Sequence, residues 1–327
     1  MTRRGELLRL LADGRLHSGE ELAARLAVSR AAVWKQLQQL DDWGVGLDAQ
    51  PGQGYRLAAP LDLLDADAIR AALPQWSAGR LRQLEVHEEL DSTSDRLLAV
   101  QDLPPGQFDA CLAEFQRAGR GRRGRRWLAP FASGLCLSVN WNFRDAPAAL
   151  GALSLASGVA VLRALRRLGF HGLALKWPND IVHGTKKLGG ILIDLRSEAA
   201  GPAYVVVGVG INVQLSPAMQ EALSTDGLEA TDLASIGTVP GRSLAVAALI
   251  SELALALEEF GTRGMSAFAD EWQGADALVG RPVRVQQGEQ TFEGLARGVD
   301  SDGALLLDAG DGRRRILSGE VSVRPVQ

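Results

Sequence analysis

A short basic loop is the part of this sequence whose residue types are best suited to chemistry. Between Gln116 and Trp127 the chain carries six arginines, three glycines and no acidic residue. Guanidinium groups bind phosphate and carboxylate oxygens through paired hydrogen bonds, and glycines let backbone N–H groups come close to a ligand. The loop follows an apolar segment, residues 110–115, that is typical of a buried strand. We therefore expect a binding site for a ligand with several negative charges.

The glycine spacing in this loop allows more than one interpretation. Gly119, Gly121 and Gly124 match the G-x-G-x-x-G pattern of dinucleotide-binding folds, which requires a helix to open at the third glycine. Only seven residues, 127–133, separate the loop from the next strand-like segment, and Pro130 is one of them, so a crossover helix does not fit. An arginine-rich nucleic-acid-binding segment and a solvated basic loop stay open as alternatives. Ordered binding of a nucleoside triphosphate is the interpretation we favour.

The composition is that of an ordinary globular protein. The 327 residues are 46% hydrophobic and 23% charged, with a formal net charge of −4, which suits two or three domains with their own cores. This mild acidity gives no support to wholesale coating of nucleic acid, so any such role needs a local patch. Cys111 and Cys136 lie in apolar, strand-like segments, and we expect two buried, reduced thiols.

The N-terminal segment and the hydropathy pattern bear on location. The first residues form an amphipathic segment with internal charges and lack the apolar core of a signal peptide. We find no run that approaches the roughly 18 apolar residues of a membrane span. The sequence therefore predicts a cytoplasmic protein without a membrane partner.

Residues 1–60 have the pattern of a winged helix-turn-helix domain. Ser18 and Ser29 are suitable N-caps for a second and a third helix, and residues 45–57 have the pattern of a hairpin. In such domains the helix after the turn enters the major groove with its N-terminal end first. The positions expected to face DNA are Ser29, Arg30, Ala31, Lys35 and Gln38. Eight basic and seven acidic side chains give a weak electrostatic signal, so a protein-interaction module is the alternative.

The rest of the chain divides into three parts. Residues 61–84 indicate a connector with one short helix. Residues 85–272 mix strand-like and helical patterns and predict an α/β domain with a mixed sheet. Its expected strands are 110–115, 135–141, 191–195 and 204–213, and its expected long helices are 148–168 and 244–260. Residues 275–327 hold four short strand-like segments between turn signals, a spacing typical of a small barrel. The fold class is therefore α+β with several domains.

Four motifs in this sequence resemble those of the biotin–protein ligase family. One is the arginine–glycine loop, and a second is Lys-Trp-Pro-Asn-Asp at 176–180 followed by Lys-Lys-Leu-Gly-Gly-Ile-Leu at 186–192. Asp-Ser-Thr-Ser at 91–94 is similar to the family's Asp-Ser-Thr-Asn, and Gly-Val-Gly-Ile-Asn at 208–212 to its Gly-Ile-Gly-Ile-Asn. With the N- and C-terminal blocks, the motifs cover essentially the whole chain. The resemblance implies the bacterial bifunctional form, a biotin ligase that also represses the biotin operon, with a class II synthetase-like ligase domain and an SH3-like C-terminal barrel.

The resemblance also implies a set of biotin-binding residues. They are Ser92, Thr93, Gln116, Gly119, Arg120, Arg122, Lys187 and Gly190. Ser92 and Thr93 could equally cap a helix that runs from Asp95 onward. Ser94 stands where the family usually has Asn, so a contact made by that side chain is in doubt.

A second, overlapping set is implied for ATP and for catalysis. The ATP and adenylate residues are Arg120, Arg122, Trp127, Lys176, Asn179, Lys187 and Asn212, and the catalytic ones are Lys187, Arg120, Arg122, Asp180 and Lys176. Fixed cations suit a transition state that gathers negative charge, and Lys187 can place its ammonium between the biotin carboxylate and the α-phosphate. Asp180 is a candidate magnesium ligand, although an Asp in a tight turn is often only a turn former. Trp127 could pack beside adenine or belong to the core.

The implied reaction has two steps. Biotin and ATP, with Mg²⁺, give biotinyl-5′-AMP and pyrophosphate, and the biotin is then transferred to a lysine of the biotin carboxyl carrier protein of acetyl-CoA carboxylase. The adenylate is also implied to be the co-repressor, because the loaded protein forms a homodimer that binds operator DNA of biotin synthesis genes. Two alternatives are a lipoate or octanoate transferase with the same fold and a non-enzymatic, biotin-sensing regulator.

Overall fold

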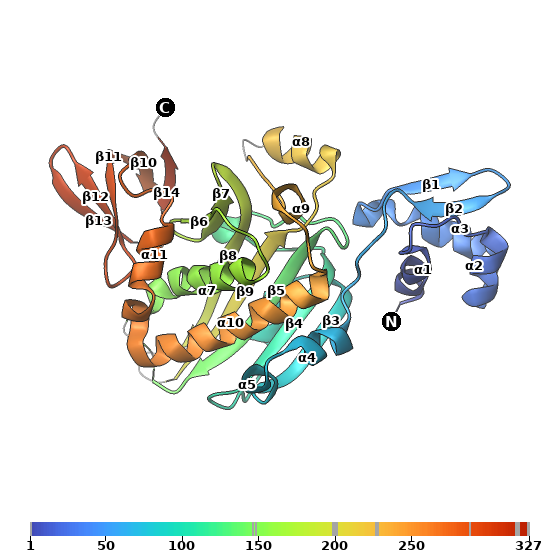
Figure 1. Ribbon diagram of the computed structural model, residues 1–327, viewed down its shortest axis with the longest axis horizontal. Coiled ribbons are helices and arrows are strands. Elements are labelled where there is room, and N and C mark those ends of the chain that lie inside the picture. The colour runs from blue at the N-terminus through green and yellow to red at the C-terminus, as the bar shows by residue number, and fades with distance from the viewer. Residues whose placement is uncertain are drawn as a thin grey trace.

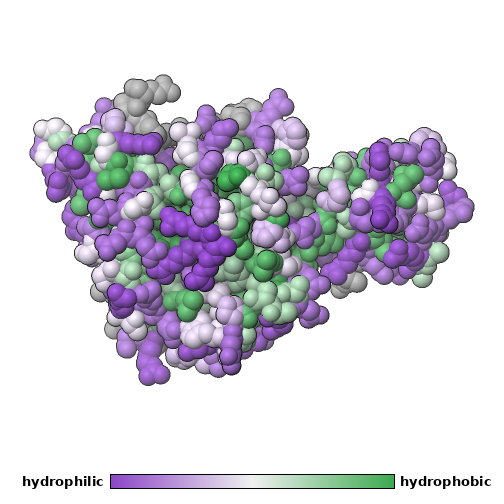
Figure 2. Space-filling view, in the orientation of Figure 1, coloured by the Kyte–Doolittle hydropathy of each residue, from purple (hydrophilic) through white to green (hydrophobic). Residues whose placement is uncertain are grey.

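The molecule consists of three parts arranged along the chain. The computed structural model describes residues 2–145, 147, 149–197, 202–225, 229–287, 289–317 and 321–325. Figure 1 shows an N-terminal lobe, a central sheet covered by helices and a small C-terminal sheet. In the space-filling view the N-terminal lobe projects to one side of the molecule and stays in contact with the rest (Figure 2). The α+β multidomain architecture predicted from the sequence is confirmed.

The N-terminal lobe has the predicted winged helix-turn-helix arrangement. Its helices α1 (Arg3–Leu11), α2 (Gly19–Arg25) and α3 (Arg30–Gln38) precede a 3₁₀ turn (Asp41–Trp43) and the hairpin of β1 (Leu47–Gln50) and β2 (Gly54–Leu57). The hydroxyls of Ser18 and Ser29 accept hydrogen bonds from the N–H groups of Glu21 and Ala32, as expected of N-caps. Leucines from all three helices fill a core cluster separate from that of the central sheet.

The central domain is built on a seven-stranded mixed sheet. The strand order is β3-β4-β5-β9-β8-β7-β6, in which β3 and β4 are parallel and the other neighbours antiparallel. The strands are β3 (Leu81–Leu90), β4 (Phe108–Gln116), β5 (Gly134–Phe143), β6 (Leu173–Lys176), β7 (Asp180–His183), β8 (Lys186–Ser197) and β9 (Ala203–Asn212). The sequence predicted β4, β5, β8 and β9, whose burial leaves apolar runs. It did not predict β3, an edge strand with mostly polar side chains.

Helices cover both faces of this sheet. Figure 1 shows α7 (Leu153–Arg167) and α10 (Arg242–Arg263) lying across one face. The short helix α6 (Thr93–Leu98) packs on the opposite face, where Leu97 clusters with the buried Cys111. Both cysteines are buried and outside any disulfide, as predicted. Three further helices follow β9 in the described part of the chain besides α10: α8 (Pro217–Thr225), α9 (Leu233–Ile236) and α11 (Ala269–Ala275).

The start of α7 corrects the prediction of a helix over 148–168. The α-helix begins at Leu153, after a 3₁₀ turn from Leu150 to Ala152. Ala149 has φ −111° and ψ 44°, outside the helical region, so the apolar run before Leu153 does not belong to the α-helix. A Cβ at Gly303 would lie 2.8 Å from the Cα of Ala152, which shows that this run packs against the C-terminal part instead.

The segment between the lobe and the sheet is folded onto the central domain. It contains α4 (Ala66–Ala72) and α5 (Gln75–Ala78), where the sequence predicted one short helix. A single turn such as α5 is too short to leave a periodic pattern in the sequence. Leu64 and Ile69 are buried in the same core cluster as the central sheet.

A buried ion pair fixes the entry of this segment. The Nη1 of Arg242 donates to Glu114 Oε2 at 2.6 Å, and both side chains are almost completely buried. Glu114 also accepts a hydrogen bond from the N–H of Leu64, and the N–H of Arg242 donates to Asp62. Because a charge left alone in the interior is costly, each of these groups depends on its partners.

The C-terminal part is a five-stranded antiparallel sheet in the order β13-β12-β11-β10-β14. Its strands are β10 (Pro282–Gln287), β11 (Gln290–Val299), β12 (Leu305–Ala309), β13 (Gly312–Ile316) and β14 (Val321–Pro325), of which the sequence predicted the first four. The predicted turn at 288–289 lies partly outside the described residues. None of the helices in the described part of the chain is long and apolar enough to cross a membrane.

Candidate active site

The arginine–glycine loop is an ordered hairpin between β4 and β5. The N–H of Trp127 donates to Gly119 O at 2.9 Å, and the N–H of Gly121 donates to Arg125 O at 2.7 Å. Arg123 turns the chain at the tip with a positive φ of 59°, and Arg126 donates to the carbonyl of Arg117. These hydrogen bonds close the hairpin, from which the guanidinium groups project.

The part of the sheet beneath the hairpin consists of glycines, Gly190 of β8 and Gly208 and Gly210 of β9, which we call the glycine floor. Gly190 lies opposite Gly210, and Gly208, two residues before Gly210, lies on the same face of β9. A Cβ at Gly210 would collide with the indole of Trp127, and one at Gly208 would lie 2.7 Å from Ser94 Oγ. Glycine is therefore required for this close approach. Trp127 lies on the sheet, and its Nε1 is buried without a hydrogen-bond partner among the described residues.

Small polar side chains from α6 border the same surface. The hydroxyl of Ser92 caps α6 by accepting from the N–H of Asp95, so the capping role considered for Ser92 is present. The N–H of Thr93 donates to Gln116 Oε1 at 2.8 Å, and the hydroxyls of Thr93 and Ser94 lie 2.8 and 3.1 Å from Ser138 Oγ. The structure thus brings Ser92, Thr93 and Gln116 together, and it adds Ser138, which no motif in the sequence indicated.

A lysine–aspartate pair lies at the other side of the hairpin. Lys187 Nζ is 2.6 Å from Asp180 Oδ1, and each side chain is about 30% exposed (30% and 27%). A Cβ at Gly190 would lie 3.4 Å from Lys187 Nζ, so the ammonium lies over the glycine floor. The predicted turn between β6 and β7 positions the aspartate, and it contains a cis peptide bond between Trp177 and Pro178.

Asn179 ties this turn to β8. Its Nδ2 donates to Ile191 O at 2.6 Å, and its carbonyl accepts from the N–H of Ile191 at 3.0 Å. Behind the turn, Trp177 is buried and donates through Nε1 to Gly303 O at 2.9 Å. The turn is therefore anchored on the central sheet and on the C-terminal part together.

The two candidate arginines of the hairpin differ in their surroundings. Arg122 reaches the turn, where its Nη1 lies 3.4 Å from Asn179 Oδ1. Burial lowers the pKa of Arg122, and repulsion from Arg123 and Arg125 lowers it further, while the attraction of Asp180 opposes both. A partly desolvated guanidinium of this kind interacts strongly with an anion.

Arg120 points to carboxylates instead. Its two terminal nitrogens lie 3.1 and 2.8 Å from the carboxylate oxygens of Asp194, and Nη2 is also 2.8 Å from Asp95 Oδ1. Neither acid was among the predicted site residues. Their spacing from the loop in sequence gives no signal, because the contact joins β8, α6 and the hairpin.

Two further candidates lie at the same edge of the sheet. Lys176 ends β6 and lies opposite Asp180 in the backbone register of β6 and β7, with its side chain half-buried. Asn212 ends β9 and is buried, and its Nδ2 donates to Thr231 O at 3.0 Å. The backbone of Thr231 in turn bonds to Lys187 O, so the segment at 229–231 passes directly beside the lysine.

The predicted DNA-facing positions lie on one exposed side of the N-terminal lobe. Arg30, Ala31, Lys35 and Gln38 are all exposed on α3, and Arg30 Nη1 lies 3.3 Å from Glu20. Trp34, which was not among the predicted positions, lies on the same side and is 46% exposed, with its ring 6.0 Å from that of Tyr55 in the wing. Helical spacing from Ala31 and Gln38 would have identified it.

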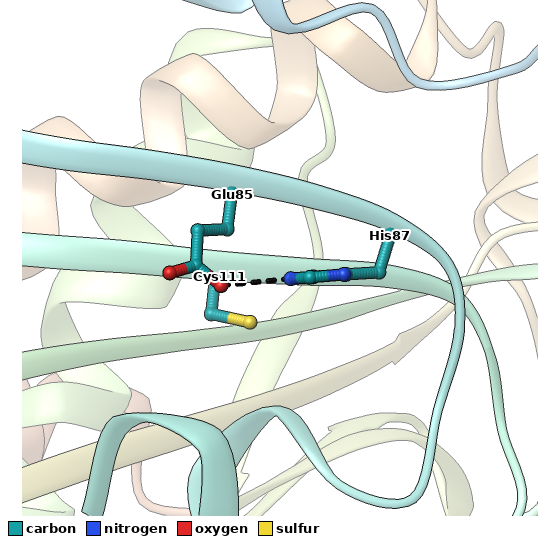
Figure 3. A group of neighbouring side chains, drawn as sticks. All are labelled: Glu85, His87 and Cys111. Atoms are coloured by element: carbon teal, nitrogen blue, oxygen red, sulfur yellow. Dashed lines mark hydrogen bonds and ion pairs between the residues drawn. The ribbon is translucent and has the colours of Figure 1, made fainter. Parts of the chain in front are cut away.

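A cluster outside this site has ligand types suited to a metal ion. Figure 3 shows Glu85, His87 and Cys111 on β3 and β4, with His87 Nε2 2.8 Å from Glu85 Oε2. Both oxygens of Glu85 also bind Arg96 at 2.8 Å, which already supplies a positive charge. Burial raises the pKa of the Cys111 thiol to about 12, so the thiol is protonated at neutral pH. The positions of Glu85 and His87 are explained by these contacts, and Cys111 belongs to a buried apolar cluster with Leu97.

Comparisons with known proteins agree with this geometry. The biotin/lipoate A/B protein ligase family matches residues 88–212, the C-terminal domain of biotin protein ligases matches residues 278–324, and a helix-turn-helix domain matches residues 3–56. The chain is 40% identical to the bifunctional ligase/repressor BirA of Salmonella typhimurium and 39% identical to that of Escherichia coli, in each case over 98% of this chain and 97% of that protein. The chain belongs to the bifunctional ligase/repressor family.

Other members of the wider group share the ligase portion. The biotin–[acetyl-CoA-carboxylase] ligase of Mycobacterium tuberculosis is 36% identical over 81% of this chain and 97% of that protein. The structure of a biotin protein ligase from Aquifex aeolicus in complex with biotin and ATP is 28% identical, with a TM-score of 0.63, and covers 75% of this chain and 100% of that one. As a ligase/repressor, the protein thus combines a ligase domain with an N-terminal helix-turn-helix domain in one polypeptide.

Proposed function

We propose that this ligase/repressor activates biotin as biotinyl-5′-AMP and transfers it to a lysine of a biotin carboxyl carrier protein. The observation that carries the proposal is the meeting of Lys187, Asp180 and Arg122 at one edge of the glycine floor. Two cations and a carboxylate beside a part of the sheet lined by glycines suit the attack of a carboxylate on the α-phosphate of ATP. Magnesium arrives with ATP as substrate, and Asp180 is the carboxylate we assign to it.

Each residue has a distinct role in the first step. The ammonium of Lys187 lies between the biotin carboxylate and the α-phosphate, which it holds within reach of each other. Arg122 neutralises the charge that builds on the phosphate, with Lys176, Asn179 and Asn212 at the nucleotide. The biotin head meets Ser92, Thr93 and Gln116, while its apolar chain crosses Gly190 beneath the hairpin at Gly119. We place the adenine against Trp127.

The second step needs a neutral amine from the acceptor lysine. Because lysine titrates near ~10.4 in water, a nearby base or a shift of that pKa is required. Asp180 is the carboxylate closest to Lys187 among the residues described, and we assign to it the reception of the acceptor amine. Since the reaction consumes ATP, we place it in the cytoplasm.

The N-terminal lobe supplies the regulatory half of the proposal. The exposed side of α3 would contact operator DNA of biotin synthesis genes through Ser29, Arg30, Ala31, Lys35 and Gln38. The adenylate would act as co-repressor by promoting a homodimer, whose two-fold symmetry matches an inverted repeat. The test is binding of the biotin-loaded protein to biotin-operon promoter DNA and to a random duplex over a range of salt concentrations. Equal affinity for the promoter DNA and the random duplex would contradict the proposed role as a repressor.

One experiment tests the enzymatic half. The protein is mixed with ATP, magnesium and either biotin or octanoate, and the products are analysed by mass spectrometry. We expect biotinyl-5′-AMP from biotin and no comparable adenylate from octanoate. A preference for octanoate would favour the lipoate-type transferase, which belongs to the same matched family. Failure to form either adenylate would contradict the enzymatic proposal.

A further inference from the structure

The exposed side of α3 carries an aromatic ring to which no role has yet been assigned. Trp34 is 46% exposed, and it is the only aromatic residue among the large apolar side chains that lie exposed in the described part of the chain. We infer that Trp34 is a base-reading residue, whose indole contacts the methyl group of a thymine in the major groove of DNA. This inference rests on the proposed function of the N-terminal lobe, and it names the kind of base that the lobe reads.

Trp34 occupies a position from which a recognition helix reads base edges. Four exposed residues of α3 recur at i, i+3, i+4 and i+7, a spacing that places side chains on one face of a helix and suits a helix lying in the major groove. They are Ala31, Trp34, Lys35 and Gln38. The opposite face of α3 is buried in the core of the lobe. A helix that enters the groove with its exposed face inward therefore brings the indole to the bases.

The ring of Tyr55 in the wing supports the indole from one side. The two ring centroids lie 6.0 Å apart, within the range of a favourable aromatic contact. Tyr55 is itself held in place, because its N–H and carbonyl form hydrogen bonds of 2.9 Å with the carbonyl and N–H of His17. Its ring also lies against the start of α2, where a Cβ at Gly19 would be 3.3 Å from Tyr55 Cε2. An indole supported in this way loses little conformational freedom when DNA covers it.

The charges around Trp34 favour DNA as the partner that covers the ring. The helix α3 has no acidic residue, and its two cations, Arg30 and Lys35, are exposed on the same side as Trp34. Residues 1–60 as a whole hold eight basic and seven acidic side chains, and Arg30 lies within 3.3 Å of Glu20. Attraction to phosphates is therefore weak, and it carries no sequence information. The preference of the lobe for one DNA sequence then depends on contacts with base edges.

The chemistry of an indole selects thymine among the bases. Every base presents hydrogen-bonding groups in the major groove, and thymine alone adds a methyl group. Covering one methyl group with the indole removes apolar surface from water and should raise the affinity about fourfold. With one such contact in each half-site of the proposed dimer, the gain is about tenfold.

The first test removes the methyl groups from the DNA and the ring from the protein. Biotin-loaded protein is titrated with biotin-operon promoter DNA and with the same duplex in which deoxyuridine replaces every thymidine. The wild-type protein should bind the thymidine duplex about tenfold more tightly, whereas Trp34→Ala should bind the two duplexes within about twofold of each other. A preference that persists in Trp34→Ala would assign the methyl contact to another residue such as Ala31. That result, or the absence of a preference in the wild-type protein, would overturn the inference.

Lys35→Ala is the matched control from the same face of α3. Because it removes a charge and keeps the indole, it should weaken binding to both duplexes and lower the salt dependence while the preference for thymidine stays. Trp34→Ala should leave the salt dependence unchanged. Circular dichroism checks that both variants keep the fold, which we expect because both side chains are exposed.

The second test does not depend on the identity of the operator. The wild-type protein and Trp34→Ala are each used to select duplexes from a randomised pool. The wild-type protein should enrich a thymine at one position of each half-site, and Trp34→Ala should lose the enrichment at that position only. Selected sequences unrelated to biotin promoters would contradict the proposed operator and would still test Trp34. Identical selections by the two proteins, or no enrichment by the wild-type protein, would overturn the inference.

Discussion

The two loops that meet over the active site are held in opposite ways. The turn from Lys176 to Asp180 is anchored from inside: Trp177 is buried, Asn179 makes two hydrogen bonds to Ile191, and Ser154 donates to Pro178 O. The hairpin at 117–127 depends more on ion pairs: that of Arg117 with Asp91 has side chains 60% and 70% exposed, and that of Arg120 with Asp194 has side chains 36% and 18% exposed.

This difference indicates a site with one fixed wall and one adjustable cover. Buried packing and satisfied hydrogen bonds resist displacement, whereas exposed ion pairs contribute about 0–1 kcal/mol each and exchange readily with water. A ligand that carries negative charge can therefore compete for the arginines of the hairpin without disturbing the turn. Lys187 and Asp180 lie on the fixed wall, so a rearrangement of the hairpin would leave their geometry unchanged.

The largest expected effect comes from removing the cation of the fixed wall. Lys187→Ala should lower adenylate formation by a factor of about 10³ or more, because it removes the ammonium between carboxylate and phosphate. Lys186→Ala is the matched control, since Lys186 is exposed and adjacent. Pyrophosphate release under saturating substrates is the measurement. Near-normal release by Lys187→Ala would break the comparison, because the wall would then play no part in catalysis.

Removing the cation that the cover brings to the site should have a smaller effect. Arg122→Ala should lower kcat by about 10²-fold, a typical loss for one charged group that stabilises the transition state. Arg123→Ala, at the exposed tip of the same hairpin, should retain activity within about threefold. The same pyrophosphate assay serves for both. If the two variants behaved alike, the special position of Arg122 beside Asn179 would have no catalytic meaning.

The packing of the fixed wall can be weakened directly. Trp177→Phe removes the donor to Gly303 O and part of a buried ring, and we expect it to lower the free energy of unfolding by about 2 kcal/mol. Trp34→Phe, at an exposed ring, should change it by less than about 0.5 kcal/mol. Denaturant unfolding followed by circular dichroism gives both values. Equal stability of the two variants would show that the wall does not depend on this contact.

Salt should act on the cover and spare the wall. Raising the ionic strength from about 0.1 to about 1 M shortens the screening length from about 10 to about 3 Å. Hydrogen exchange should then become a few-fold faster at 117–127 and change less at 176–180, because only the last residue of the turn, Asp180, takes part in an ion pair and the rest is held by packing and neutral hydrogen bonds. The measurement is exchange followed by mass spectrometry of the unliganded protein. A similar response in both segments would remove the distinction between them.

The sequence predicted the candidate site residues well where they lie together in short contiguous motifs. The hairpin, the turn at 176–180, Lys187 and the glycines of β9 are contiguous motifs, and their resemblance to a known family identified them. The strands β5 and β9 were predicted because burial on both faces leaves apolar runs. The polar edge strand β3 and the single-turn helix α5 leave no such pattern.

Contacts between segments that are distant in the sequence could not be predicted from it. Asp95, Asp194 and Ser138 lie in the site because α6, β8 and β5 pack together, and their own neighbours in sequence give no hint of it. Trp34 was different, since the helical period alone places it beside Ala31 and Gln38. The start of α7 was placed too early because an apolar run continues into a segment that packs against Gly303 without being helical.

The residues just after the hairpin belong to the central domain in sequence but pack in the core of the N-terminal lobe. Phe131 stacks on Trp43 of the N-terminal lobe, with ring centroids 4.6 Å apart and planes at 7°, and its N–H donates to Trp43 O. Phe131 and Ala132 are buried in the core cluster of that lobe. A shortened enzyme that lacked residues 1–60 would therefore present a bare aromatic ring to water at the foot of its own ligand cover. Removing the N-terminal lobe would therefore expose apolar surface of the ligase domain that the lobe now covers.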